Sequence, residues 1–163
     1  MQTEELGSVY EGLLELTPRL DGSGRGMTFA EGIETKGNER KTSGSYYTPD
    51  SLVQTPLDSA LDPILDRLEA ESGTNTSDPA AHLLPVTVID PACGSGHFLL
   101  AAVRRIATRV ARLRKDGVPS QDDYRIALRD VVRLCIYGVD RNPMAVELSR
   151  VALWIETVEP GSV

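Results

Sequence analysis

The chain has 163 residues, of which 40% are hydrophobic and 25% are charged, and its formal net charge is -7 with a pI near 4.8. This composition is typical of one globular domain and excludes the fibrous and membrane-spanning classes. No apolar run approaches the ~20 residues of a transmembrane span, and the first residues, MQTEE, lack the basic and apolar parts of a signal peptide, so we expect a cytoplasmic protein. The negative net charge argues against DNA binding by this stretch alone, because proteins bind duplex DNA largely through Lys and Arg side chains that neutralise phosphates.

The two cysteines, Cys93 and Cys135, are too few and too far apart for a disulfide framework or a metal cluster. We therefore expect reduced, half-buried thiols and no metal site. Cys93 has no evident base or cationic neighbour, which favours a small apolar filler over a nucleophile.

The amino-terminal part divides into an apolar stretch and a glycine-rich one. Over residues 4–16 the apolar side chains recur at helical spacing, which predicts a short helix that docks on the rest of the protein. Residues 17–44 are polar and carry many glycines, which predicts a loop with room for a short hairpin.

A second helix is predicted from Thr48, a suitable N-cap, with Pro49 at the first helical position. Its apolar face extends to Leu68, and Pro56 and Pro63 should kink or split it. The stretch 71–85 is rich in Ser, Thr, Gly and Pro and predicts a surface insertion that tolerates changes of length.

The chain is organised around residues 86–98 (VTVIDPACGSGHF), where an apolar, β-branched run ends in an acid and a loop of small residues. An apolar stripe from Leu99 to Leu113 then predicts an amphipathic helix. Gly94 and Gly96 can adopt backbone angles closed to other residues, and the amides at the helix start can face a ligand. This strand, glycine loop and helix predict a ligand site at the carboxyl end of the strand.

Two common chemistries do not fit this loop. A phosphate-binding loop needs Gly-Lys-Ser/Thr, but Gly96 is followed by His97 and Phe98. A nucleophile elbow needs Gly-x-Ser-x-Gly, and neither His82 nor His97 has an evident relay partner. The remaining interpretation is a Rossmann-like pocket for a cofactor that contains adenosine.

The later part of the chain repeats the alternation of helix and strand. A run of six basic residues lies mostly opposite the apolar stripe, which predicts a solvated helix face, or alternatively a contact with nucleic acid or a neighbouring domain: Arg104, Arg105, Arg109, Arg112, Arg114 and Lys115. Ser120 begins a helix over 120–134 with a capping-box pattern, and a strand over about 135–139 ends on Asp140. Asn142 and Pro143 then start a last helix.

Three segments in order resemble adenine-specific DNA methyltransferases, the branch that includes type I and type IIG restriction-modification enzymes and phage-defence methylases. Residues 90–99 (DPACGSGHFL) resemble the cofactor loop, residues 43–49 (SGSYYTP) the segment that precedes it, and residues 137–143 (YGVDRNP) the acid of the second strand. The resemblance implies an α/β fold, a partial Rossmann-like fold for S-adenosylmethionine that contains its first two parallel strands. We expect an amino-terminal helix and glycine-rich loop at 1–45 and the first half of the methyltransferase domain at 46–163.

The resemblance also implies which residues meet S-adenosylmethionine. It places Asp90, Pro91, Ala92, Gly94 and Gly96 in the cofactor loop. Asp90 would shape that loop or meet the methionine amine, against the alternative of a simple turn cap.

Four further residues would complete the cofactor site. Tyr47 and Thr48 would lie beside the methionine end, the alternative being a helix cap preceded by a packing aromatic. Phe98 would line the pocket or pack locally. Asp140 would accept hydrogen bonds from the ribose hydroxyls, the alternative being a surface turn acid.

The acceptor segment that this family uses for catalysis, Asn/Asp-Pro-Pro-Tyr/Phe, does not occur in residues 1–163. We therefore expect an amino-terminal piece of a larger enzyme that is inactive alone and has no catalytic residue of its own. DNA would be contacted by regions outside it, in the rest of the parent enzyme. A protein or RNA methyltransferase and a non-enzymatic binding module remain as alternatives.

Overall fold

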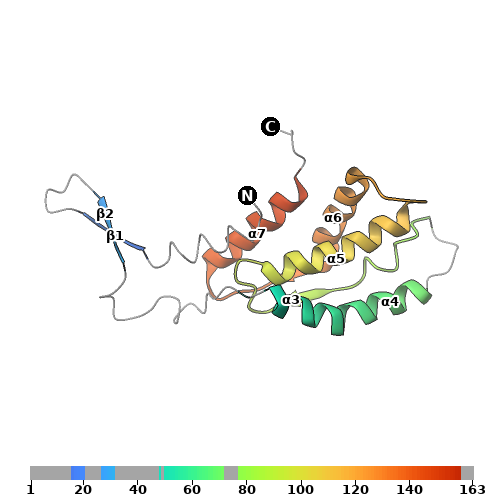
Figure 1. The fold of residues 1–163 in the computed structure, drawn as a ribbon, viewed down its shortest axis with the longest axis horizontal. Helices are drawn as coiled ribbons and strands as arrows, with labels where there is room; N and C mark the ends of the chain where they lie inside the picture. Colours follow the sequence, from blue (N-terminus) through green and yellow to red (C-terminus); the bar gives the residue numbers. More distant parts are fainter. Residues whose placement is uncertain (1–15, 21–26, 32–47, 49, 72–76, 159–163) are drawn as a thin grey trace. The chain divides into compact units, whose positions relative to one another are not determined.

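A computed structural model of the chain describes residues 16–20, 27–31, 48, 50–71 and 77–158. The chain divides into two compact units, Met1–Tyr47 and Thr48–Val163, and each is described by itself below (Figure 1). In the described residues, no helix is long and apolar enough to cross a membrane.

The first unit contains a β-hairpin. Strands β1 (Leu16–Leu20) and β2 (Met27–Glu31) pair antiparallel, with Leu16 opposite Glu31 and Leu20 opposite Met27. The short hairpin predicted within 17–44 is confirmed. The predicted helix over 4–16 is wrong at its last residue, because Leu16 pairs in the ladder and Pro18, two residues later, does not suit a continuing helix. Residues 4–15 lie outside the described part.

The second unit is built around one long helix, α5 (His97–Arg114). Helix α5 contacts α3 (Asp50–Pro56), α6 (Gln121–Cys135), α7 (Pro143–Thr157) and the strands β3 (Val88–Asp90) and β4 (Ile136–Gly138) (Figure 1). The apolar stripe predicted for this helix is confirmed, since Leu99, Val103, Ile106 and Val110 are all buried.

Strands β3 and β4 pair parallel, with Val88 opposite Ile136 and Asp90 opposite Gly138. Both predicted strands are confirmed, each shorter than the predicted 86–90 and 135–139. The described residues thus form a partial α/β fold, and the hairpin is a separate two-stranded sheet.

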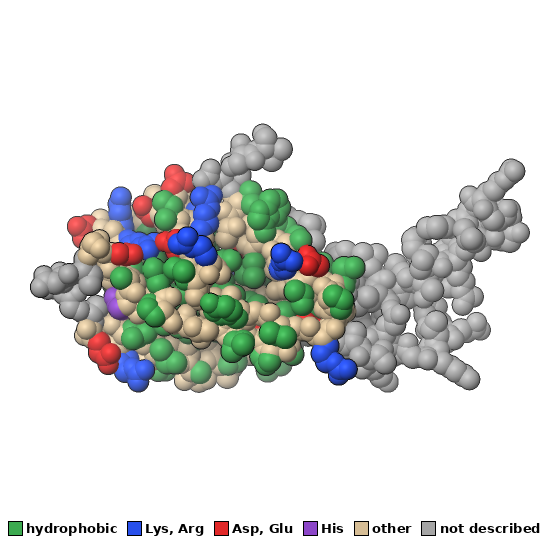
Figure 2. All heavy atoms as spheres, turned by 180° about the vertical axis from the view of Figure 1, so that it is seen from behind, with side chains coloured by type: hydrophobic (Ala, Val, Ile, Leu, Met, Phe, Trp, Pro, Cys, Tyr) green, Lys and Arg blue, Asp and Glu red, His purple; other side chains and the backbone are tan. Residues whose placement is uncertain are grey.

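One face of the parallel pair is apolar and open. Side chains alternate along a strand, and Ile89 and Tyr137, paired across the two strands, are 62% and 51% exposed. Val88 and Ile136 pack against the core. Figure 2 shows one face of this unit with apolar side chains over its middle and charged ones mostly toward its edges.

The stretch predicted as a surface insertion contributes to the core instead. Its first part, 72–76, lies outside the described residues, and 77–85 form turns. Ala80 and Leu83 are fully buried in the core cluster. The prediction of a surface insertion is therefore wrong for 77–85. The polar composition of this stretch predicts turns, but it does not show that Ala80 and Leu83 are buried in the core.

The helix that begins at Asp50 is interrupted where the prolines predict it. Between α3 and α4 (Asp62–Glu71) lies a π-helical turn, η1 (Leu57–Leu61), in which the Asp62 amide donates to the Leu57 carbonyl. Pro63 has no amide to continue the α-helical ladder there. Pro49, the predicted first helical residue, lies outside the described residues.

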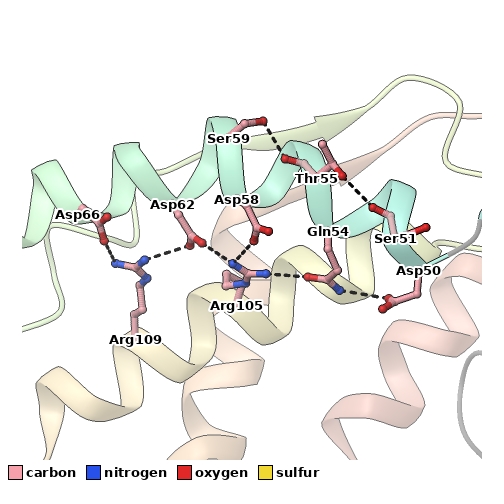
Figure 3. A network of polar contacts seen from close by, with 10 residues as sticks. All are labelled: Asp50, Ser51, Gln54, Thr55, Asp58, Ser59, Asp62, Asp66, Arg105 and Arg109. Atoms are coloured by element: carbon pink, nitrogen blue, oxygen red, sulfur yellow. Dashed lines mark hydrogen bonds and ion pairs between the residues drawn. The ribbon is translucent and has the colours of Figure 1, made fainter.

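The basic run on α5 is paired inside the protein. Arg105 donates to Gln54, Asp58 and Asp62, and Arg109 donates to Asp62 and Asp66 (Figure 3). Arg109 also donates to Glu69. Arg104 binds Glu156 of α7 through two bonds, and Arg114 binds Asp78 and Asp130. The predicted solvated face is wrong for these four arginines, because carboxylates of neighbouring helices and of the turns at 77–85 pair with them. The alternative of a contact with nucleic acid or a neighbouring domain stays a prediction.

The predicted caps of the last two helices are confirmed. At the start of α6, the Ser120 hydroxyl accepts from the Asp123 amide while the Asp123 carboxylate accepts from the Ser120 amide. At the start of α7, the Asn142 side chain accepts from the Met144 amide at 3.0 Å, and Pro143 occupies the first helical position.

Candidate functional site

The candidate site lies where the two parallel strands end. Beyond the paired residues Asp90 and Gly138, the chains remain joined, because the Val139 amide donates to the Asp90 carbonyl at 2.8 Å. The Cys93 amide then donates to the Val139 carbonyl at 2.9 Å. These bonds hold the loop after β3 (91–96) against the segment after β4 (139–142). Such a paired strand end is the usual position of a ligand site in an α/β sheet.

Asp140 joins the two segments through its side chain. One carboxylate oxygen, Oδ2, accepts from the Gly94 amide at 2.9 Å, and the other, Oδ1, accepts from the Asn142 amide at 2.8 Å. Asp90 closes its own turn, since its Oδ1 accepts from the Ala92 amide at 3.0 Å. The amides of Ala92, Cys93 and Gly94 are therefore already bonded within the fold, to two carboxylates and a carbonyl.

The two loop glycines adopt the backbone conformation that their sequence predicts. Gly94 has φ of 53° and Gly96 has φ of 87°, in the left-handed region that disfavours residues with a Cβ. Gly96 is also in close contact with α7, because a Cβ at this position would lie 2.5 Å from Ser149 Oγ. Substitution at Gly96 is thus opposed by both backbone conformation and packing.

The strand ends carry negative charge that no side chain neutralises. In the described part of the chain, neither Asp90 nor Asp140 forms a salt bridge, and their carboxylates accept only from backbone amides. Burial raises the pKa of the Cys93 thiol, and the carboxylates of Asp140 and Asp90 raise it further. The burial of Cys93 fits the predicted apolar filler, although both thiols are more buried than the predicted half-buried position.

The structure brings together only some of the predicted site residues. The structure holds six of them in the two hydrogen-bonded segments at the strand ends: Asp90, Pro91, Ala92, Gly94, Gly96 and Asp140. Phe98 is half-buried and packs against the core. Thr48 is exposed before α3, and Tyr47 lies outside the described residues.

Two residues of the site were missed by the sequence reasoning. Ser149 is buried beneath Gly96, and Gly138 lies so close to Cys93 and Leu99 that a Cβ would approach their side chains to 3.2 and 2.8 Å. A signal for Ser149 exists in the sequence, because it lies on one helical face with Ala145 and Ala152. A row of small residues indicates close packing, although it does not name the partner.

Comparison with known proteins identifies the class. Residues 70–160, more than half of the chain, match the family model described as the MmeI DNA-methyltransferase domain. The chain is 32% identical over 127 residues to the adenine-specific methyltransferase PglX of Streptomyces coelicolor, a match covering 76% of this chain and 9% of that protein. It is 30% identical over 121 residues to the MjaIX type I restriction enzyme methylase subunit of Methanocaldococcus jannaschii, covering 74% and 15%.

A further M. jannaschii protein, provisionally named a type II restriction enzyme and methyltransferase, is 26% identical over 183 residues, covering 94% of this chain and 14% of that protein. The chain belongs to the MmeI family of DNA-methyltransferase domains, within the adenine methylases of restriction-modification systems. It spans between 9 and 15% of the length of these relatives. No solved structure gives a significant match to it.

Proposed function

We propose that this chain is the S-adenosylmethionine-binding part of a site-specific DNA methyltransferase that modifies the exocyclic amine of adenine in restriction-modification or phage defence. The observation that carries the proposal is the bond between the Gly94 amide and Asp140 Oδ2. It joins a glycine loop after one parallel strand to an acid after the next, which is the arrangement of an α/β cofactor site.

The charge at the strand ends suits this cofactor. S-adenosylmethionine supplies, when bound, an electrophilic methyl group on a positively charged sulfonium, and it also carries an ammonium group and a ribose diol. Asp90 and Asp140 accept only from backbone amides among the described residues, no Lys or Arg lies within 86–98, and Arg141 is the one cationic residue within 139–142. A triphosphate would meet repulsion here, whereas a cationic ligand gains favourable Coulomb energy.

Each side chain has a specific proposed role. A carboxylate has about four lone-pair sites, so the Asp140 oxygens that accept from Gly94 and Asn142 keep capacity for two ribose hydroxyls. Asp90 holds the turn and orients the methionine amine. Tyr47 and Thr48 lie beside the methionine end in this proposal, and Phe98 contributes to the wall of the pocket.

The remaining parts of the reaction are assigned to the rest of the parent enzyme. The described residues orient the methyl donor, while acceptors for the adenine amine belong to an Asn/Asp-Pro-Pro-Tyr/Phe segment that residues 1–163 do not contain. The exposed face around Ile89 and Tyr137 supports further elements packing there to complete a Rossmann-like sheet. In the same proposal, the rest of the parent enzyme contacts DNA, and the enzyme is cytoplasmic.

The test uses protein expressed from the complete reading frame. Calorimetry should show binding of S-adenosylmethionine, and incubation with radiolabelled methyl donor and DNA should place the label in N6-methyladenine after digestion to nucleosides. Residues 1–163 alone should bind the donor more weakly than about 10 μM and transfer no methyl group. Label in RNA or protein, or no donor binding by the complete protein, would contradict the proposal.

A further inference from the structure

Gly138, the last residue of β4, is a glycine that its backbone conformation does not require. Its φ lies outside the left-handed region, unlike that of Gly94, Gly96 and Gly117. A glycine in a strand has no side chain to pack and loses more conformational entropy on folding than other residues. Such a glycine often marks a point where another part of the chain approaches closely. The reason for a glycine at this position is therefore sought in its surroundings.

The first turn of α5 and the glycine loop both press against Gly138. Side chains alternate along β4, so a side chain here would point to the same face as Ile136, which packs against the core. An added Cβ would lie 2.8 Å from Leu99 Cδ1, 3.2 Å from Cys93 Sγ and 3.3 Å from Cys93 Cβ. Cys93 and Leu99 are 6% and 1% exposed, so neither side chain has open space beside it. A single methyl group on Gly138 would therefore push the loop and the start of α5 away from β4.

The bonds of the candidate site begin directly after Gly138. The Cys93 amide donates to the Val139 carbonyl at 2.9 Å, and the Gly94 amide donates to Asp140 Oδ2 at 2.9 Å. Bonds of this kind form over a donor–acceptor distance of only about 2.7–3.2 Å. Both bonds thus depend on a loop that lies close to the end of β4, which the missing side chain permits.

We propose that Gly138 is a positioning residue, whose missing side chain sets the distance between the cofactor loop and Asp140 and thereby the affinity for the cofactor. This inference rests on the proposed function for its binding readout. Gly138 acts through Cys93 and Leu99, because these are the side chains that an added Cβ would displace. Displacement of the loop breaks the bond between Gly94 and Asp140, which weakens cofactor binding.

The binding test uses the complete protein with Gly138→Ala. The Kd and the KM for S-adenosylmethionine should rise about tenfold, the effect of losing one hydrogen bond to a charged group, while kcat at saturating donor and the KM for DNA stay constant. The melting temperature should fall, whereas the same change at an uncrowded strand position raises it. An unchanged donor Kd or a raised melting temperature would overturn the positioning role.

Leu99→Val tests whether crowding is the cause. It removes one carbon from the side chain nearest the added Cβ, so the double variant with Gly138→Ala keeps the summed side-chain volume. In the Leu99→Val background, Gly138→Ala should raise the donor Kd only about threefold, because the contacts with Cys93 remain. An equal rise in both backgrounds would contradict the proposal. If Gly138→Ala alone does not fold, the value in this background decides, and no rise there would reject the positioning role.

The matched control is Ala127→Val, which adds bulk elsewhere in the interior. Ala127 is fully buried on α6 and belongs to the core cluster, which includes none of Gly138, Cys93 and Leu99. The change should lower the melting temperature and leave the donor Kd as in wild type. A rise in Kd as large as that of Gly138→Ala would attribute both effects to lost stability and so refute the positioning role.

A second measurement does not require cofactor. In ligand-free protein, Gly138→Ala should speed hydrogen exchange at the amides of Cys93 and Gly94 about fivefold relative to amides in the middle of α5, which should not change. Absence of donor binding by wild-type protein combined with this faster exchange would reject the proposed function alone. Unchanged loop exchange would reject the positioning role of Gly138, whatever the protein binds.

Discussion

Two groups of carboxylates in the second unit differ in the partners that they bind. Along α3, η1 and α4, Asp58, Asp62 and Asp66 face arginines of α5 (Figure 3). At the strand ends, Asp90 and Asp140 accept only from backbone amides. The first group is balanced by cationic side chains, and the second keeps its negative charge.

In the proposed function, this difference separates acids that stabilise the fold from acids that meet the cofactor. An arginine-paired carboxylate between packed helices has its charge matched within the protein, so it has little to offer a ligand. Amide hydrogen bonds fix the orientation of a carboxylate without cancelling its charge, which is the preorganisation that a cationic or polyhydroxyl ligand requires. The acidic residues of this unit therefore include one group that pairs with arginines of the fold and one group that can bind a ligand.

The sharpest test of the comparison is Asp140→Ala in the complete protein. The variant loses the acceptor for the Gly94 and Asn142 amides together with the proposed ribose contacts. We expect the Kd for S-adenosylmethionine to rise by the equivalent of about 2–4 kcal/mol and the fold to lose about 1–3 kcal/mol. Asp140→Asn, which keeps one acceptor oxygen, should cost less. Calorimetric Kd values that match wild type for both variants would make Asp140 a turn residue only.

The glycine loop offers a second test, Gly96→Ala. Backbone strain at φ of 87° and the contact with Ser149 should together destabilise the chain by about 2–3 kcal/mol, measured by urea unfolding. Gly117→Ala is the matched control, because φ is 101° there but no atom lies within 4 Å of the added Cβ. We expect about 1–2 kcal/mol for Gly117→Ala. Equal losses at both sites would show that Ser149 does not crowd Gly96.

The arginine-paired acids should respond to Arg109→Met, which keeps the apolar stem of the side chain. The change leaves Asp66 and Glu69 without this partner and should destabilise the chain by about 1–2 kcal/mol in urea, less at high salt. Arg150→Met, which removes an exposed pair with Glu147, should cost under about 0.5 kcal/mol. Neither variant should alter the affinity of the complete protein for S-adenosylmethionine. A changed donor Kd for Arg109→Met would show that the arginine-paired acids also affect cofactor binding.

The smallest expected effect is a pH dependence at Asp78. Its hydrogen bond to Arg114 holds the pKa of the Asp78 carboxyl below its ordinary value near 3.9. The stabilisation is complete above the unfolded pKa and is lost as pH falls through the lower folded pKa. For this partly exposed pair we expect well under about 1 kcal/mol. Urea midpoints should therefore separate wild type from Asp78→Asn at pH 7 and converge near pH 2.

Sequence reasoning succeeded where contacts are local. The Ser120–Asp123 capping box, the Asn142 cap and the positive φ of Gly94 and Gly96 each depend on residues a few positions apart. The apolar stripe of α5 likewise follows from the period of the helix. These features place both strands and the loop of the candidate site.

Contacts between distant residues could not be predicted in the same way. Arg105 and Arg109 look solvated in a helical projection, because the acids that pair with them lie 40 to 47 positions earlier, on η1 and α4. The burial of Leu83 and the contact between Ser149 and Gly96 also depend on how helices pack. The sequence locates Asp140 at a strand end, but its bond to Gly94 requires the parallel register.

The π-helical turn at Leu57–Leu61 limits which insertions and deletions this part of the chain can tolerate. Acids four residues apart drift around an α-helix by roughly 40° per step, and the wider turn offsets that drift, which keeps the row of acids aligned with α5. Deleting one residue of the turn would rotate everything after it by roughly 100°. Insertions and deletions of single residues should therefore be selected against between Asp50 and Glu71, even at exposed positions where point substitutions are harmless.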